Sequence, residues 1–277
     1  NVVSDRLKSS GIDGSRLDAR LLVADAAGVP SETALIHPDM ELDAGTRDQI
    51  AALMARRMGR EPMSHILGVR EFWSMAFEVT SDTLTPRPDT ESLVESVLAA
   101  VRECGLTDTL SILDLGTGTG CILLALLSEL PGATGVGIDV STDALTVAQR
   151  NADCHGLAPR VDFRAGNWLA DVQETFDVIV SNPPYIETDE IALLDPEVAQ
   201  YEPVAALDGG PDGLAPYRDI CMSAAGVLKL GGIIGLEVGV NQSGAVRKIL
   251  ESAGFSEIHI KQDLAGRHRV VMATLSK

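Results

Sequence analysis

The sequence predicts an α/β protein in which a mostly parallel sheet follows a smaller N-terminal helical domain. Three observations lead to this prediction. From about residue 90 onward, short apolar strands alternate with helices, which is typical of a parallel sheet covered on both faces. Before about residue 65, apolar residues recur at helical spacing instead. The last two strands have no helix between them, so they are expected to form an antiparallel pair at one edge.

Residues 1–65 are expected to form the helical domain. The segment LDARLLVADAAGVP places leucines near helical spacing until a glycine and a proline end the run. The segment TRDQIAALMARRMGRE predicts a second helix, with Ile50, Leu53 and Met54 on one face. Both segments have the length of short bundle helices.

Residues 66–88 are expected to be a β-hairpin linker, and residues 89–277 the second domain. The linker segment EFWSMAFEVTSDTLTPRP contains aromatic and β-branched residues around a polar centre, and its prolines end the hairpin. The second domain is expected to contain helices at 91–104, 121–130, 141–156, 217–230 and 242–254, and strands at 110–116, 133–140, 160–166, 176–182, 231–239, 256–262 and 269–275.

Charge and composition exclude several classes of function. The 277-residue chain carries a net charge of −18, and an acidic surface repels phosphate backbones, so nucleic acid is not expected as a partner. Four irregularly spaced cysteines without a CxxC pair predict no metal site and a reducing, cytoplasmic location. No run approaches the ~20 apolar residues of a membrane helix. The first residues lack the apolar core of a signal peptide, so no membrane association is expected.

The segment ILDLGTGTGCILLALL is predicted to be a strand, a glycine loop and a helix. Glycines at 116, 118 and 120 permit positive φ and a close approach of the backbone to a ligand. Dinucleotide-binding folds use the spacing GxGxxG, whereas this loop has GxGxG after an acid, Asp114. The pattern resembles the first motif of class I S-adenosylmethionine methyltransferases. A tight turn without a ligand is the alternative.

Side chains after the next two strands are expected to reach the same crevice. Asp139 ends its strand in GVGIDVS, where a carboxylate can accept hydrogen bonds from both hydroxyls of a ribose. Its alternative is a role at the start of the following helix. Asn167 and Trp168 follow the third strand, where an adenine would lie against the Trp ring and its amine near Asn167. A lone Trp is otherwise a core residue.

The fourth strand ends in Asn182, Pro183, Pro184 and Tyr185. Ligands of open α/β sheets bind beyond the carboxyl ends of the strands, so this loop should face the methyl donor. The prolines fix φ and have no N–H, so the carbonyl groups remain available as acceptors. Asn182 and the Pro183 carbonyl would hold an NH₂ group with its lone pair toward the methyl group, and Tyr185 would cover the planar group. An ordinary proline-rich strand exit is the alternative.

Together these motifs resemble the release-factor glutamine methyltransferases, the PrmC/HemK family. The resemblance runs over nearly the whole chain, through PMSHILGVREFW, TPRPDTE, LDLGTGTG, GIDVS, GNWL, SNPPYI, YEPVAALDGGPDGLAPYR, LEVGVNQ and DLAGRHRVV. It implies a Rossmann-like sheet of seven strands and a helical domain that recognises the substrate. It also implies methyl transfer from S-adenosyl-L-methionine to the side-chain nitrogen (N5) of the glutamine in the Gly-Gly-Gln motif of peptide chain release factors, the proteins of translation termination.

The resemblance also implies roles for individual residues. Asn182, Pro183 and Tyr185 would be catalytic and would hold the glutamine amide together with Pro184. Arg87, Pro88 and Thr90 would line the same cleft, Glu202 would order the loop after the fourth strand, and Glu237 would satisfy core or loop donors. The family often has Asp where this chain has Asn167, whose carbonyl oxygen can still accept from adenine. The implied donor-binding residues are Gly116, Thr117, Gly118, Thr119, Gly120, Asp139, Asn167, Trp168 and Asn182.

Two other functions fit parts of the sequence. A DNA adenine N6-methyltransferase is the main alternative, because it shares the NPPY motif and the problem of a delocalised amino group. It would need clustered Lys and Arg, and the dense basic cluster here is limited to Arg56, Arg57 and Arg60. A non-catalytic binding module is the second alternative, against which the intact NPPY motif and glycine loop argue. Nothing in the sequence demands a dimer, so a monomer is expected.

Overall fold

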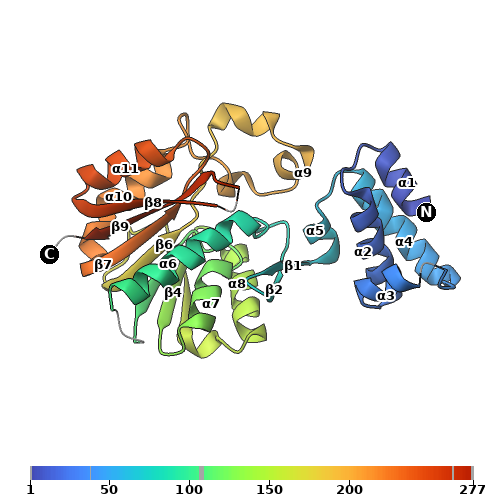
Figure 1. The fold of residues 1–277 in the computed structure, drawn as a ribbon, viewed down its shortest axis with the longest axis horizontal. Coiled ribbons are helices and arrows are strands. Elements are labelled where there is room, and N and C mark those ends of the chain that lie inside the picture. Colours follow the sequence, from blue (N-terminus) through green and yellow to red (C-terminus); the bar gives the residue numbers. More distant parts are fainter. Residues whose placement is uncertain (1, 38, 106–108, 264, 276–277) are drawn as a thin grey trace. The chain divides into compact units, whose positions relative to one another are not determined.

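The computed structural model describes residues 2–37, 39–105, 109–263 and 265–275. The chain divides into two compact units (Figure 1). The helical unit contains residues 1–69 and 195–201, and the sheet unit contains residues 70–194 and 202–277. The sequence-based division into 1–65, 66–88 and 89–277 stays a prediction, and it did not assign residues 195–201 to the helices.

The helical unit is built around a small apolar core. The two helices predicted from the sequence are present as α2 and α4, and Ile50, Leu53 and Met54, predicted on one face of α4, are buried. Three helices before β1 were not predicted, because two of them are only five or six residues long and the third is the first element of the chain. The helices are α1 (Val2–Ser9), α2 (Ser15–Ala27), α3 (Ser31–Ile36), α4 (Ala44–Met58), α5 (Met63–Leu67) and α9 (Pro196–Ala199).

Ion pairs and one hydrogen bond join residues 195–201 to the N-terminal helices. Arg57 lies 2.8 Å from Asp18 and 3.0 Å from Glu197 of α9. Arg60 pairs with the other oxygen of Glu197 at 2.8 Å. The Tyr201 hydroxyl donates to the Gly59 carbonyl at 2.6 Å. These contacts explain why a segment from the second half of the chain belongs to the helical unit.

A short hairpin, β1 (Val69–Phe72) and β2 (Met75–Glu78), follows the helices. Its two turn residues, Trp73 and Ser74, have φ of 52° and 57°, the left-handed conformation that two-residue hairpin turns require. Phe72 and Phe77 are buried with their rings edge to face, 6.2 Å apart. The hairpin is therefore shorter than the predicted segment, and residues 79–87 continue as a loop.

The sheet of the second unit has seven strands in the described residues, in the order β5-β4-β3-β6-β7-β9-β8. The first five in this order are parallel, while β9 runs antiparallel to both β7 and β8. This arrangement confirms the mostly parallel sheet with an antiparallel edge. The strands are β3 (Ser111–Leu115), β4 (Thr134–Asp139), β5 (Val161–Ala165), β6 (Phe176–Ser181), β7 (Leu228–Glu237), β8 (Phe255–Gln262) and β9 (His268–Leu275).

Helices cover both faces of this sheet (Figure 1). Successive residues of a strand point to opposite faces, so Ile112 packs with α6 (Glu91–Glu103) and α7 (Cys121–Glu129) while Leu113 packs with α10 (Ala215–Val227) and α11 (Ser243–Ser252). Helix α8 (Thr142–Cys154) adds Ala152 to the first cluster. Burial on both faces explains why the central strands β3 and β6 are apolar without alternation.

The predicted boundary between helix 217–230 and strand 231–239 was wrong. Helix α10 ends at Val227, and residues 228–230 are the first residues of β7. Leu228 pairs with Phe176 of β6, and Lys229 forms an ion pair with Asp177 at 2.8 Å. Strand pairing with β6 thus overrides the helical spacing of these leucines, which a single segment of sequence does not reveal.

The parallel register brings the carboxyl ends of four strands to one level. Leu115 of β3 is opposite Ile138 of β4 and Ser181 of β6, and Ser181 is opposite Leu236 of β7. The residues that follow, Gly116, Asp139, Asn182 and Glu237, therefore gather along the same edge of the sheet.

Candidate active site

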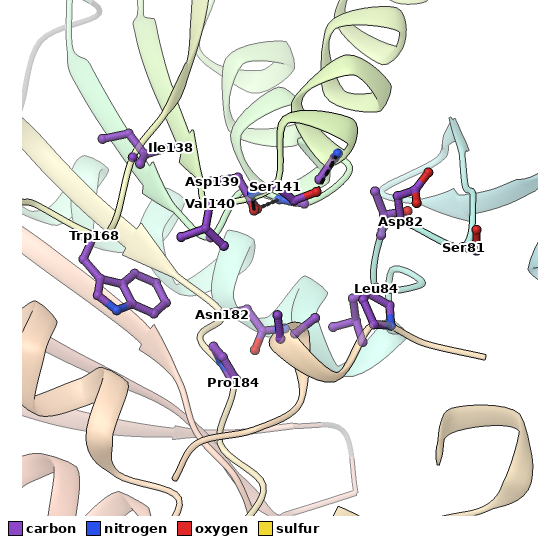
Figure 2. Close-up of a pocket in the computed structure, with 18 residues that line it drawn as sticks. Ser81, Asp82, Leu84, Ile138, Asp139, Val140, Ser141, Trp168, Asn182 and Pro184 are labelled. Carbon is purple, nitrogen blue, oxygen red and sulfur yellow. Dashed lines mark hydrogen bonds between the residues drawn. The ribbon is translucent and has the colours of Figure 1, made fainter. Parts of the chain in front are cut away.

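A cavity of about 280 Å³ lies beyond this edge of the sheet (Figure 2). This volume is near the lower end of the range usual for small-molecule sites, roughly 300–1,000 Å³. Figure 2 shows Trp168, Asp139 and Leu84 around the open space, with Asn182 and Pro184 along one side. The lining residues are Ser81–Leu84, Gly116, Gly118, Ile138–Ser141, Ala144, Gly166, Trp168, Asn182, Pro184, Pro203, Ala205 and Ala206.

The glycine loop after β3 presents two of its glycines to the cavity. Gly116 and Gly118 have φ of 69° and 55° and line the cavity. Thr117 points inward, and its hydroxyl donates to the Asp114 carboxylate at 2.7 Å. Thr119 and Gly120 are also buried and do not line the cavity. Gly116 and Gly118 therefore face the cavity, while Thr117, Thr119 and Gly120 face the interior. That all five bind the donor stays a prediction from the resemblance.

Gly120 has a packing role. A Cβ at this position would lie 3.3 Å from side-chain atoms of Ala148, Leu124 and Phe163. The missing side chain lets the start of α7 approach α8 and β5 closely. The glycine therefore fixes the direction of α7, whose first turn follows the loop.

Asp114 lies beneath the loop and is fully buried. Its Oδ2 accepts from Thr117, while Oδ1 has no hydrogen-bond partner among the described residues. Burial raises the pKa of Asp114 to about 7, and the nearby charge of Asp139 adds to the rise. The carboxylate supports the loop from below and does not line the cavity.

Asp139, at the end of β4, holds the loop from the other side. Its Oδ2 accepts from the Gly118 N–H at 2.9 Å, and its Oδ1 accepts from the Ser141 N–H at 2.9 Å (Figure 2). Each carboxylate oxygen can accept a second hydrogen bond. Asp139 lines the cavity, so these remaining acceptor positions are available to hydroxyl groups of a ligand.

Trp168 lies against the glycine loop and Asn167 does not. A Cβ at Gly116 would lie 3.5 Å from Cζ3 of the Trp168 ring, an ordinary contact distance, so the ring packs directly on the loop. The φ of 69° is what favours glycine at this position. Trp168 itself has φ of 49°, an uncommon conformation for a bulky residue that is concentrated at functional sites. Asn167 is exposed and does not line the cavity, and its contact with adenine stays a prediction.

The loop after β6 contributes Asn182 and Pro184 to the cavity. The Asn182 side-chain NH₂ donates to the Thr90 hydroxyl at 3.4 Å, which leaves its carbonyl oxygen as the acceptor. Pro183 is buried and does not line the cavity. Tyr185 also lies outside the lining, with its ring beside Gly239, and burial raises its pKa to about 12. The structure therefore brings together two of the four NPPY residues in the cavity wall.

Three residues outside the loop, Gly209, Gly213 and Gln242, contact its backbone and fix its conformation. The Gln242 side-chain NH₂ donates to the Tyr185 carbonyl at 2.9 Å and to the Gly213 carbonyl at 3.2 Å. A Cβ at Gly209 would lie 2.8 Å from the Tyr185 Cα. The Ile186 carbonyl accepts from the Gly209 N–H at 2.8 Å. We call Gly209, Gly213 and Gln242 the backing residues.

Two wall segments of the cavity were not predicted. Ser81–Leu84 come from the loop after β2, and Pro203, Ala205 and Ala206 come from a loop more than 100 residues later. Neither segment contains a binding motif, so their place in the cavity wall is evident only from the three-dimensional structure. Arg87 joins the two loops, because its Nη2 bonds both carboxylate oxygens of Glu202 at 2.8 and 2.9 Å.

The three residues that the resemblance placed in the cleft do not line the cavity. Arg87 forms an ion pair with the buried Glu202, and Pro88 is exposed. Thr90 is only 2% exposed and lies behind Asn182. In the part of the chain that the structure describes, no group of three or more His, Cys, Asp or Glu could hold a metal ion. None of its helices is both long and apolar enough to cross a membrane.

Comparison with known proteins identifies the class to which this fold and cavity belong. Residues 106–254 match the family model described as "Methyltransferase domain". The fold is similar to the hMettl16 catalytic domain solved with a MAT2A 3′UTR hairpin, with TM-score 0.61, 14% identity and coverage of 81% and 82% of the two chains. It is also similar to the ribosomal protein L11 methylase of Lactobacillus delbrueckii subsp. bulgaricus, with TM-score 0.51, 20% identity and coverage of 69% and 81%. The chain is a Rossmann-like methyltransferase.

Sequence relatives narrow the class to one family. The chain is 46% identical to a release factor glutamine methyltransferase of Rhodospirillum rubrum over 97% of this chain and 81% of that protein. It is 46% identical to one of Caulobacter vibrioides, covering 97% and 92% of the two chains. Residues 1–68 match the model described as "PrmC N-terminal domain". The chain belongs to the release factor glutamine methyltransferase family, which confirms the resemblance.

Proposed function

We propose that this chain transfers the methyl group of S-adenosyl-L-methionine to the side-chain nitrogen of the glutamine in the Gly-Gly-Gln motif of peptide chain release factors. Besides family membership, one observation carries the proposal. Asn182 lines the same cavity as Gly116, Gly118 and Asp139, and its NH₂ is already bonded to Thr90. An acceptor for an amide NH₂ therefore lies beside a cavity suited to a nucleoside.

The cavity fits the chemistry of the donor at its nucleoside end. Asp139 has acceptor positions for two ribose hydroxyls while its other lone pairs hold backbone N–H groups. The Trp168 ring and the apolar side chains of Ile138, Val140 and Ala144 offer a surface for a flat base. Gly116 and Gly118 have no side chain to exclude the rest of the molecule.

The residues of the chain would act by positioning. S-adenosylmethionine supplies a methyl group on a positively charged sulfur. An amide nitrogen is a weak nucleophile, because its lone pair is delocalised into the carbonyl group. Hydrogen bonds from its two N–H groups to Asn182 Oδ1 and the Pro183 carbonyl would orient the nitrogen and reduce this delocalisation. Tyr185 would then act by fixing the conformation of the loop rather than by covering the substrate.

We propose that residues 1–65 recognise the folded release factor, with residues 66–88 as the linker to the catalytic part. The match to the "PrmC N-terminal domain" model supports this assignment. The basic cluster Arg56, Arg57 and Arg60 gives no support to DNA binding, because each of the three forms an ion pair with a glutamate of the same unit. Release factors act where proteins are synthesised, so we place the reaction in the cytoplasm, with the enzyme as a monomer.

Methyl transfer from labelled donor tests the proposal. The chain is incubated with labelled S-adenosylmethionine and either a release factor, its Gly-Gly-Gln variant with Gln→Ala, or duplex DNA. We expect label on the intact release factor only. Label on DNA would establish the adenine methyltransferase alternative, and label on the Gln→Ala variant would show that another residue is the acceptor.

A further inference from the structure

Gln242 directly precedes α11, but its side chain does not cap this helix. Polar side chains at such positions normally accept a hydrogen bond from the first turn of the helix. The Gln242 side chain makes no capping hydrogen bond. It bonds instead to the loop after β6 and to two other segments of the chain. The role of a glutamine at this position therefore lies outside the helix.

Three hydrogen bonds use both ends of the Gln242 amide. Its Oε1 accepts from the Gly239 N–H at 3.0 Å, two residues after β7 ends. Its Nε2 donates to the Tyr185 carbonyl at 2.9 Å and to the Gly213 carbonyl at 3.2 Å. A backbone N–H only donates and a backbone carbonyl only accepts, so the direction of all three bonds is fixed. The amide can therefore take only this orientation without losing its partners.

The segments around the Gln242 amide leave it no room to move. A Cβ at Gly213 would lie 2.6 Å from Gln242 Nε2, and a Cβ at Gly239 would lie 2.7 Å from Oε1. Both distances are shorter than real Cβ contacts, so only glycine fits at either position without displacing the amide. The Gln242 N–H also donates to the Gly239 carbonyl at 3.2 Å. The backbone and the side chain of Gln242 are thus tied to the same glycine.

The Gln242 amide anchors one end of the NPPY loop, residues 182–185. Strand β6 anchors the other end, where the Ser181 hydroxyl donates to the Leu115 carbonyl at 2.7 Å. The two prolines between these anchors have a fixed φ, so the loop has little freedom to absorb a movement of Tyr185. A shift of the Tyr185 carbonyl would therefore also move the carbonyl group of the first proline.

We infer that Gln242 is a positioning residue for methyl transfer, which holds the NPPY loop so that its acceptor groups meet the substrate amide. This inference rests on the proposed function, in which Asn182 and the Pro183 carbonyl accept from the glutamine N–H groups. Gln242 does not line the cavity, so it acts through the loop. Its effect falls on the rate of the reaction, because a displacement of about 1 Å in a positioning group can cost ~100-fold.

Two substitutions of Gln242 test the inference at pH 8. Gln242→Met keeps the length of the side chain and removes its polar groups. Gln242→Glu keeps the acceptor for Gly239, but an ionised carboxylate cannot donate and repels the carbonyl oxygens of Tyr185 and Gly213. The same two substitutions at Gln149, an exposed residue of α8, are the matched controls. Each protein is measured for kcat, for KM with a release factor, and for donor affinity by calorimetry.

We expect both Gln242 variants to lower kcat by ~10- to ~100-fold, with the larger loss for Gln242→Glu. The loss should appear in kcat and not in KM, as for an interaction that acts only in the transition state. Donor affinity should remain that of the wild type, because Asp139 and the glycine loop are held together by bonds that do not involve Gln242. Both Gln149 variants should behave like the wild type.

Three results would overturn the inference while the wild type remains active. One is an unchanged kcat in both Gln242 variants. The others are a joint loss of kcat, donor affinity and melting temperature, and a failure of both variants to fold, since each would assign Gln242 a structural role. A wild type that methylates no release factor would instead refute the proposed function itself.

Discussion

At the scale of single residues, the two buried acids Asp114 and Glu237 stand out. Burial raises the pKa of each to about 7, from ordinary values of 3.8 and 4.5. Between the ordinary value and about 7, the unfolded chain loses these protons and the folded chain keeps them. The folded state then binds more protons than the unfolded state, so stability falls as the pH rises through this range.

Asp114→Asn should therefore gain stability relative to the wild type as the pH rises. The difference in free energy of unfolding should grow between about pH 4 and pH 7 and then become constant, because Asp114 is ionised in both states above pH 7. A rise in pKa from 3.8 to about 7 corresponds to roughly 4 kcal/mol. Urea unfolding at pH 5, 6, 7 and 8 measures the difference, to which Glu237 does not contribute because it titrates in both proteins. A pH-independent difference would contradict the assigned cause.

Much of the cavity lining could be predicted from single residues, whereas the direction of each side chain could not. Gly116, Gly118, Asp139, Trp168, Asn182 and Pro184 line the cavity as expected from their places after strands. Thr117, Thr119 and Gly120 belong to the same motif but are buried and do not line the cavity. Asn167 is exposed although its neighbour lines the cavity. Motifs identify the loop, whereas backbone direction decides which of its residues reach a ligand.

At the scale of elements, the anchoring of α9 to α4 depends on Arg57. The Arg57 side chain is 10% exposed and that of Asp18 is 12% exposed. Removing one partner of a buried pair leaves the other charge unpaired, which costs more than the pair contributes.

Arg57→Met should destabilise the helical unit by about 3 kcal/mol, because Asp18 and Glu197 would lose their shared partner. Arg47→Met, in the same helix at an exposed position, is the matched control and should change stability by less than about 0.5 kcal/mol. Urea unfolding followed by circular dichroism measures both. Equal effects of the two substitutions would show that the pairs seen at Arg57 contribute nothing.

Most elements of the sheet unit could be predicted, since each strand and helix has its own apolar pattern. The helix predicted at 217–230 extended too far because Leu228 and Leu230 continue a helical spacing that pairing with β6 overrides. The attachment of residues 195–201 to the helical unit could not be predicted at all. It depends on ion pairs between Glu197 and two arginines 137 and 140 positions earlier, and no local sequence pattern predicts contacts over that separation.

At the scale of the whole molecule, the net charge of −18 dominates the electrostatics. Like charges repel one another in the folded chain and are farther apart in the unfolded chain, so this repulsion lowers stability.

Added salt should therefore stabilise the protein. Raising NaCl from ~0.02 M to ~0.3 M shortens the screening length from roughly 20 Å to roughly 6 Å, which weakens repulsion between distant charges more than attraction within close ion pairs. The melting temperature at pH 8 should rise by a few degrees, as scanning calorimetry would measure. A fall in melting temperature would mean that the ion pairs outweigh the general repulsion.

The backing residues have a consequence for any attempt to give this scaffold a new acceptor group. Gly209, Gly213 and Gln242 contact the backbone of Tyr185. The backbone conformation of residues 182–185 therefore depends on residues that are distant in the sequence. Mutant libraries confined to residues 182–185 would change the side chains of the loop but leave its backbone conformation the same. Redesign would have to vary the loop and the backing residues in the same library.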